Sequence, residues 1–233
     1  GAQAKCFTLS LTLPKLDERW LQEFSGSLKE ASEFFNVSLI GGDTTKGPLN
    51  ITITIMGAVE KSKAIKRSGA NIGDDIYISG SLGDAALCLK KINEGSVPNI
   101  TELNKLNKPV PRLKLGSALK NIASSCIDVS DGLEQDLSHI LRASKVGAII
   151  DSQSLPLSDT VRESIKTSQD WGLPLCGGDD YELCFTSDKS NQTEIKKLSE
   201  SLKIRITKIG VINNSQTLEI LGYEGSSKSY QHF

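Results

Sequence analysis

Strand-like and helix-like patterns alternate along the chain, and this alternation is interrupted once, at residues 61–75. Period-two alternation of apolar side chains is typical of strands, and apolar side chains at helical spacing behind Asp17 are typical of a helix with an acidic N-cap. The pattern before the interruption predicts strand, helix, strand and strand, over residues 5–13, 17–35, 37–42 and 49–60. The interrupting segment has two glycines, several cations and no periodicity, which indicates a boundary between two domains.

Beyond residue 75 the alternation resumes and again mixes strands with helices. We expect a strand, a turn and a helix over residues 75–92, a helix over 109–123, a strand running into a helix over 126–144, and a strand over 146–152. A strand over 181–187, a helix over 191–202 and a strand over 204–212 follow. Such an order predicts an α+β fold of two-layer mixed sheets with helices on one side. We place the two domains at residues 1–66 and 67–233.

Composition excludes several classes of protein. The 233 residues carry 27 Lys and Arg against 28 Asp and Glu, with no basic block, so a nucleic-acid partner is not expected. No apolar run reaches the ~20 residues of a membrane helix, and no membrane partner is expected. The five cysteines form no Cys-x-x-Cys pair and are expected to be reduced thiols of a cytoplasmic protein. The chain starts without Met directly before a strand pattern, so we expect further residues ahead of Gly1.

The stretch "CIDVSDGLEQDLSHI", residues 126–140, places acids between a strand and a helix. Asp131 with Glu134 three residues later approximates a capping box, which predicts a helix start near residue 131. Asp128 has no such role: it is flanked by apolar residues, where an unpaired carboxylate is costly, and period-two spacing directs it to the same side as Ser130. The acids thus start a helix, hold a ligand, or do both.

Two carboxylates and a hydroxyl at the end of a strand suit a hard cation with oxygen ligands. The spacing does not fit an EF-hand, because His139 stands where the bidentate Glu of the calcium loop belongs. Magnesium fits better, since it takes one or two protein carboxylates and completes its shell with phosphate oxygens and water. A magnesium–phosphate site at this junction is therefore our interpretation.

Two more acidic stretches follow glycine pairs. In "LIGGDTTKGP" the glycines, including Gly42, allow a ligand close to the backbone before Asp43, and "LCGGDDYEL" repeats the arrangement before Asp179. Each stretch on its own is also typical of a turn. Arg67, in the segment between the domains, offers a bidentate fork to a phosphate or is a solvated surface cation.

Several common enzyme motifs are missing from the sequence. It contains no phosphate-binding Gly-x-x-x-x-Gly-Lys-Ser/Thr loop, no dinucleotide Gly-x-Gly-x-x-Gly and no protein-kinase motif set. The two histidines, His139 within the helix pattern and His232 at the chain end, and the lack of Gly-x-Ser-x-Gly argue against a hydrolytic triad.

An ordered set of stretches resembles the motifs of the thiamine-monophosphate kinase family, within the aminoimidazole-ribonucleotide synthetase superfamily. The stretches are "LIGGDTTKGPLNITITIMG", "IKRSGANIGDDIYISGSLGDAALCL", "NKPVPRLKLG", "CIDVSDGL", "GGDDYELCFT" and the terminal "YQHF". The resemblance covers nearly the whole chain. It implies the two-domain architecture of that superfamily and a homodimer, and the period-two strands before residue 61 would leave sheet edges for a second copy to pair with.

By that resemblance the reaction is transfer of the ATP γ-phosphoryl group to thiamine monophosphate. The site residues that it implies are Gly42, Asp43, Arg67 and Ser130 for ATP, Asp43, Asp128 and Asp131 for Mg²⁺, and Asp179 and Tyr230 for thiamine monophosphate. No catalytic side-chain base is expected, because the accepting phosphate has a second pKa of about 6 and is largely deprotonated at neutral pH.

The sequence departs from the family pattern at three places. The family has a segment ahead of the point that matches Gly1, with further magnesium-binding aspartates; Asp179 stands where Glu is frequent, and Ser229 stands where Gly usually precedes the terminal aromatic. Two alternatives stay open: another ATP-dependent enzyme of the superfamily, acting on a purine precursor or selenide, or a non-catalytic dimerisation or nucleotide-binding fragment.

Overall fold

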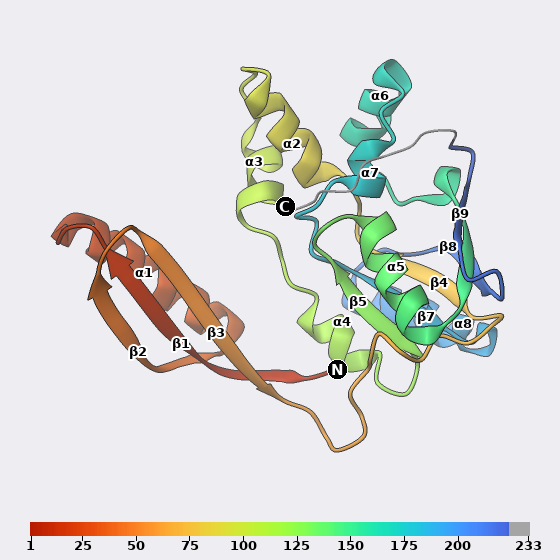
Figure 1. Ribbon diagram of the computed structural model, residues 1–233, viewed down its shortest axis with the longest axis horizontal. Helices are drawn as coiled ribbons and strands as arrows, with labels where there is room; N and C mark the ends of the chain where they lie inside the picture. Colours follow the sequence, from red (N-terminus) through yellow and green to blue (C-terminus); the bar gives the residue numbers. More distant parts are fainter. Residues whose placement is uncertain (224–233) are drawn as a thin grey trace. The chain divides into compact units, whose positions relative to one another are not determined.

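The computed structural model describes residues 1–223, which fall into two compact units. One unit comprises Ala2–Ala64, and the other runs from Ile65 onward and includes Gly1. Figure 1 shows each unit with its own sheet and helices, and we describe them separately. The α+β class with two mixed sheets is confirmed.

The first unit is a three-stranded sheet with one helix (Figure 1). Its elements are β1 (Gln3–Leu13), α1 (Glu18–Phe35), β2 (Ser38–Lys46) and β3 (Asn50–Ala58). The strand order is β2-β1-β3, with β1 parallel to β2 and antiparallel to β3. Asp17 caps α1 as expected, because its side chain accepts a hydrogen bond from the N–H of Trp20. Only Phe7 and Leu11 of this unit are buried, so its own core is very small.

The second unit is built on a six-stranded sheet of order β5-β7-β4-β8-β6-β9, antiparallel except for the pair β6 and β9. Its strands are β4 (Asp75–Ser79), β5 (Ser125–Val129), β6 (Gly147–Asp151), β7 (Glu182–Ser187), β8 (Ile206–Asn213) and β9 (Leu218–Leu221). Its helices are α2 (Asp84–Asn93), α3 (Ile100–Asn107), α4 (Leu113–Ala118), α5 (Leu133–Ser144), α6 (Asp159–Ser168), α7 (Gly172–Cys176) and α8 (Gln192–Leu202), with short 3₁₀ turns at Ser152–Ser154 and Lys189–Asn191.

Two apolar clusters flank this sheet. Ile76 and Ile78 of β4 belong to the larger cluster, which includes the apolar face of α5, whereas Tyr77 between them belongs to the other, with side chains of α4 and α8. This is the alternation that a strand with both faces covered requires. Helices therefore pack on both faces of the second sheet, where one covered face was expected.

The helix expected over residues 109–123 is much shorter, and α3 was not expected at all. Pro111 fixes its own backbone and restricts the residue before it, so α4 begins only at Leu113. The start of α3 has a capping box: the side chain of Asn99 accepts from the N–H of Glu102, and the Glu102 carboxylate accepts from the N–H of Asn99.

None of the five cysteines, which all lie among the described residues, forms a disulfide. No helix among residues 1–223 has the length and apolar character to cross a membrane.

Candidate active site

The end of β5 carries the first group of predicted site residues. β5 is at an edge of the described sheet and pairs with β7, where Asp128 lies opposite Leu183. Asp128 is exposed, and the prediction of a desolvated carboxylate at this position is wrong, because its side chain projects from the face of β5 opposite to the buried Ile127 and Val129. Ser130 and Asp131, which follow the strand, are half-buried.

The predicted capping role of Asp131 is also wrong. α5 begins at Leu133, its N-cap is Gly132 with φ of 111°, and no side chain forms a hydrogen bond of the capping type there. Instead, Asp136 inside the helix accepts the backbone N–H groups of both Ser130 and Asp131 on one oxygen, Oδ2, at 2.9 and 3.0 Å. The Asp131 carboxylate is thereby left for other uses, and its Oδ2 accepts from Gln135 at 3.1 Å.

The loop before β7 is joined to this turn by backbone hydrogen bonds. The N–H of Asp179 donates to the carbonyl of Ser130, and the N–H of Tyr181 donates to the carbonyl of Val129, both at 2.9 Å. Asp179 and Tyr181 have φ of 67° and 50°, a strained conformation for residues with side chains. The phenol of Tyr181 also donates to Asp179 Oδ1 at 3.1 Å. The structure thus brings Asp179 next to the turn that carries Ser130 and Asp131.

These residues line one pocket of about 790 Å³. One wall consists of α2 side chains and the other of the β5–α5 turn and the loop before β7. The lining residues are Ala86, Leu89, Lys90, Asn93, Glu94, Ser130, Asp131, Cys176, Gly177, Gly178, Asp179 and Tyr181.

Negative charge accumulates in this region without a matching cation. Burial raises the pKa of the Tyr181 phenol, and the nearby charges of Asp179, Asp128 and Asp131 raise it further. In the described part of the chain, no Lys or Arg forms an ion pair with any of these three aspartates, and the pocket cation Lys90 is paired with Asp170 at 2.8 Å. Such a field attracts cations.

The other predicted site residues lie elsewhere in the chain. Gly42 and Asp43 lie within β2 of the first unit, so the turn alternative for them is wrong. Arg67 is exposed in the second unit, and its carbonyl accepts from the Ser144 hydroxyl at the end of α5. Tyr230 falls outside the described residues.

Comparison with known proteins shows the family of the chain. The family of AIR synthase related proteins matches over both of its parts, the N-terminal domain at residues 1–59 and the C-terminal domain at residues 71–222. The thiamine-monophosphate kinase of Haemophilus influenzae is 45% identical over 217 residues, which are 91% of this chain and 66% of that enzyme. The chain belongs to the thiamine-monophosphate kinase family. It spans about two thirds of the length of the Haemophilus relative.

Solved structures of the thiamine-monophosphate kinase family have the same fold. The enzyme from Stenotrophomonas maltophilia K279a has a TM-score of 0.91 at 38% identity, covering 96% of this chain and 74% of that one. AaThiL complexed with AMPPCP and TMP has a TM-score of 0.87 at 26% identity, covering 100% of this chain and 75% of that one.

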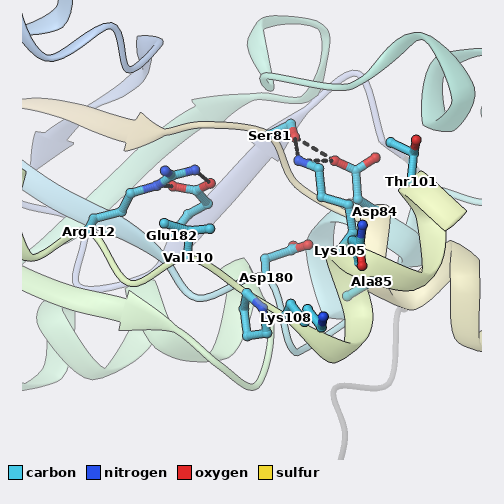
Figure 2. A pocket seen from close by; sticks show the side chains of 12 residues that line it. Ser81, Asp84, Ala85, Thr101, Lys105, Lys108, Val110, Arg112, Asp180 and Glu182 are labelled. Atoms are coloured by element: carbon cyan, nitrogen blue, oxygen red, sulfur yellow. Dashed lines mark hydrogen bonds and ion pairs between the residues drawn. The ribbon is translucent and has the colours of Figure 1, made fainter. Parts of the chain in front are cut away.

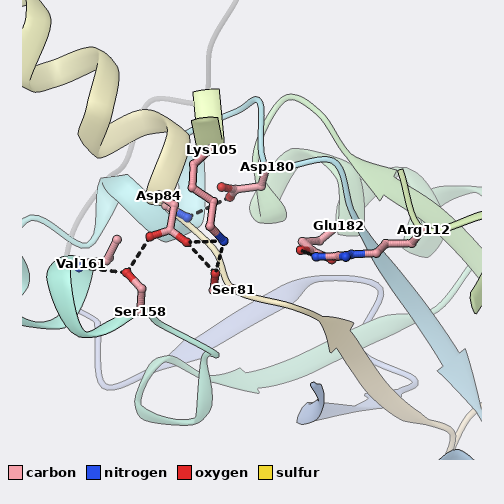
Figure 3. A network of polar contacts seen from close by, with 9 residues as sticks. Ser81, Asp84, Lys105, Arg112, Ser158, Val161, Asp180 and Glu182 are labelled. Atoms are coloured by element: carbon pink, nitrogen blue, oxygen red, sulfur yellow. Dashed lines mark hydrogen bonds and ion pairs between the residues drawn. The ribbon is translucent and has the colours of Figure 1, made fainter. Parts of the chain in front are cut away.

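This thiamine-monophosphate kinase family member has a second, smaller pocket of about 270 Å³ between α2, α3 and the start of β7, which sequence reasoning missed (Figure 2). Two of the three cations in its lining have acidic partners. Arg112 forms a two-pronged ion pair with the buried Glu182, and Lys105 lies 3.2 Å from Asp84, whose other oxygen accepts from Ser158 (Figure 3). The side chains of Arg112, Glu182, Lys105 and Asp84 thus neutralise one another, and Lys108 adds a further cation to the lining.

Asp180 lines the smaller pocket and stands between two residues of the larger one. Its Oδ2 accepts from the N–H of Gly83 at 2.8 Å. Burial raises the pKa of Asp180 to about 8, although the Gly83 hydrogen bond opposes that shift.

Sequence reasoning did not single out Asp136, and it noted Asp180 only as the second acid after a glycine pair, with no role assigned. The signal for Asp136 was an acid at a position between Leu133 and Leu137, on the apolar side of a helix. The signal for Asp180 was weaker, because it is simply the second of two consecutive acids in "GGDDYEL".

Proposed function

We propose that the full protein transfers the γ-phosphoryl group of ATP to thiamine monophosphate, giving thiamine diphosphate and ADP. The observation that carries this proposal is the convergence of Asp131, Ser130 and Asp179 on one pocket, with Asp128 beside them and no described Lys or Arg pairing with any of the three acids. The names of the relatives and the ligands of AaThiL, AMPPCP and TMP, support it.

Magnesium fits the donors that are present. Among the described residues there is no group of three or more His, Cys, Asp or Glu side chains that would hold a metal alone. Magnesium does not need one, since one or two carboxylates suffice when phosphate oxygens and water complete its shell. We assign Asp128 and Asp131 to this role, and we assign Asp43 to magnesium binding from the family resemblance.

Charge neutralisation is the chemistry that bound magnesium would supply. ATP and a phosphate monoester bring together several negative charges, and each close pair costs about 4 kcal/mol at 4 Å with an effective dielectric constant of 20. The acids of the pocket would raise that cost if they faced the phosphates without cations. Phosphoryl transfer depends mostly on positioning and on this neutralisation.

The remaining residues bind and orient the two substrates. Ser130, Arg67 and the backbone beside Gly42 would contact ATP, and Asp179 with Tyr230 would hold thiamine monophosphate. No side-chain base is assigned, because the accepting phosphate, with a second pKa of about 6, is mostly deprotonated at neutral pH.

We also propose that the protein works as a homodimer in the cytoplasm. The first unit leaves Ile51, Ile53 and Ile55 of β3 exposed by 43%, 49% and 60%, and an apolar strand of this kind is stable only when another surface covers it. The cytoplasm is proposed from the odd number of cysteines and the lack of Cys-x-x-Cys pairs in the sequence. Sedimentation of Ile53→Lys against the unmodified protein tests the dimer, and an unchanged mass would contradict a role for this strand.

The decisive experiment is ATP consumption by the full-length protein with magnesium, comparing thiamine monophosphate with thiamine. Turnover is expected with the monophosphate and not with thiamine, since only the former carries the accepting phosphate. Asp128→Asn is expected to abolish turnover while the thermal midpoint stays unchanged, because this exposed carboxylate has no described structural partner. Phosphorylation of thiamine alone, or full activity of Asp128→Asn at saturating magnesium, would refute the assignment.

A further inference from the structure

We propose that Asp136 is a positioning residue, which sets the place of Ser130 and Asp131 in the pocket by holding their backbone N–H groups. This inference rests on the proposed function, because it concerns how the nucleotide and metal side of that site is kept in shape. Asp136 itself faces neither substrate nor pocket; it is 3% exposed and lies beneath the turn.

The buried position of Asp136 is unfavourable for a carboxylate. Leu133 and Leu137, its neighbours along the helix, are fully buried, so this side of α5 faces the apolar core. A carboxylate there loses its hydration and needs hydrogen bonds in return. An apolar side chain would pack more cheaply, so the acid calls for a specific reason.

The Asp136 carboxylate accepts two backbone hydrogen bonds from the turn ahead of α5. Both N–H groups that reach it come from consecutive residues, Ser130 and Asp131, and both end on the same oxygen. In usual N-caps a side chain ahead of the helix accepts the N–H groups of its first turn. Here the direction is reversed: a residue inside the helix accepts N–H groups from the loop ahead of it. The contact therefore fixes the loop and not the helix.

The other side of the turn is already fixed by the loop before β7. The Ser130 carbonyl accepts from Asp179, and a side chain at Gly178 would come within 2.3 Å of that same carbonyl oxygen. A side chain at Gly132 would meet the Cys176 backbone at 2.7 Å. The turn is thus held between a close-packed backbone on one side and one carboxylate, that of Asp136, on the other.

Loss of the Asp136 acceptor leaves the N–H groups of the half-buried Ser130 and Asp131 without this partner and lets the turn move. The residues that would shift are those whose side chains face ATP and magnesium, so the effect should appear in ligand affinity. Partners that orient metal ligands typically contribute roughly 10- to 100-fold to affinity or activity.

The test measures binding of magnesium with AMPPCP, a non-hydrolysable ATP analogue, to the full-length protein by isothermal titration calorimetry. Asp136→Ala is expected to weaken binding roughly 10- to 100-fold. Asp136→Asn keeps an oxygen at the same reach and is expected to bind nearly as the unmodified protein does. Asp136→Glu keeps the charge but displaces the acceptor, and is expected to weaken binding.

Ile195→Ala is the matched control for general destabilisation. Ile195 is as buried as Asp136, at 3%, but belongs to the other apolar cluster, so its truncation should lower the thermal midpoint without changing affinity for the analogue. If Asp136→Ala lowers the midpoint and leaves affinity intact, Asp136 is structural only and the inference is wrong. The same holds if Asp136→Asn binds as weakly as Asp136→Ala. An unmodified protein that does not bind magnesium with AMPPCP would overturn the proposed function first, and this inference with it.

Discussion

The carboxylate of Asp180 accepts a hydrogen bond from the backbone N–H of Gly83 at 2.8 Å, and this contact joins the loop before β7 to the start of α2. The two segments form opposite walls of the larger pocket. Gly83 is the N-cap of α2 and has no side chain with which to cap that helix, and the carboxylate from the distant loop accepts hydrogen bonds from the backbone of Gly83 and of Ala85 in the first turn. The contact between these two segments therefore runs through an acid whose pKa is strongly raised.

Stability should fall as pH rises through the range set by Asp180. Its pKa in the fold is about 8 against 3.8 as the reference, so between these values the folded state binds the proton and the unfolded state does not. This contribution is complete below pH 3.8 and is lost as pH rises through about 8. Asp180→Asn, which cannot ionise, should flatten the decline in the free energy of unfolding between pH 5 and 9, measured by urea denaturation.

Asp188→Asn serves as the control for that measurement. Hydrogen bonds from Ser190 lower the pKa of the Asp188 carboxylate, so it titrates below the window and its removal should not alter the slope. Equal slopes for the unmodified protein and Asp180→Asn would assign the pH dependence to other groups.

The ion pair of Arg112 and Glu182 should be needed as a pair. Glu182 is 4% exposed and also accepts from the buried Ser79 hydroxyl. Arg112→Met leaves that carboxylate buried without its cation and is expected to cost about 3–5 kcal/mol. The double variant Arg112→Met with Glu182→Met removes both charges and should lose less than the sum of the single changes. A double-mutant cycle in urea measures the coupling, and additive losses would contradict it.

Gly42 is expected to be required by the sheet itself. A Cβ at Gly42 would lie 1.8 Å from the carbonyl oxygen of Leu9 in β1, whereas a Cβ at Gly41 would meet nothing within 4 Å. Their φ values, 154° and 156°, are nearly equal, so alanine imposes similar backbone strain at both positions. Gly42→Ala should destabilise the fold by more than Gly41→Ala, whose cost should stay near the ~1–3 kcal/mol of a strained residue. Similar thermal midpoints for the two variants would show that the close approach of Gly42 to Leu9 adds no loss of stability, and would contradict this prediction.

Sequence reasoning succeeded where the determinant is local. The period-two run that became β3 and the Asp17-capped helix α1 depend on neighbours a few residues away, and both were found near their predicted places. It failed for Asp128, because the exposure of this side chain depends on which face of β5 is covered by distant segments: Ile127 and Val129 on one face are buried, and Asp128 on the other face is not. The prediction for the turn between β5 and α5 failed for a related reason. The acceptor of its N–H groups, Asp136, lies inside α5, and its position in the sequence is typical of an ordinary amphipathic helix.

The corrected helix start gives a sharp prediction for Asp131→Ser. Asp131 was expected to cap α5, but the helix begins after Gly132 without a side-chain cap, so the change should alter the free energy of unfolding by no more than about 0.5 kcal/mol. The proposed magnesium role predicts instead that ATP turnover falls roughly 10- to 100-fold and that part of it returns at higher magnesium concentration. Asp159→Ser, at an exposed acid in the first turn of α6, is the control and should change neither quantity. A large loss of stability in Asp131→Ser with normal turnover per folded molecule would restore the capping role and remove the metal role, since the two interpretations move these measurements in opposite ways.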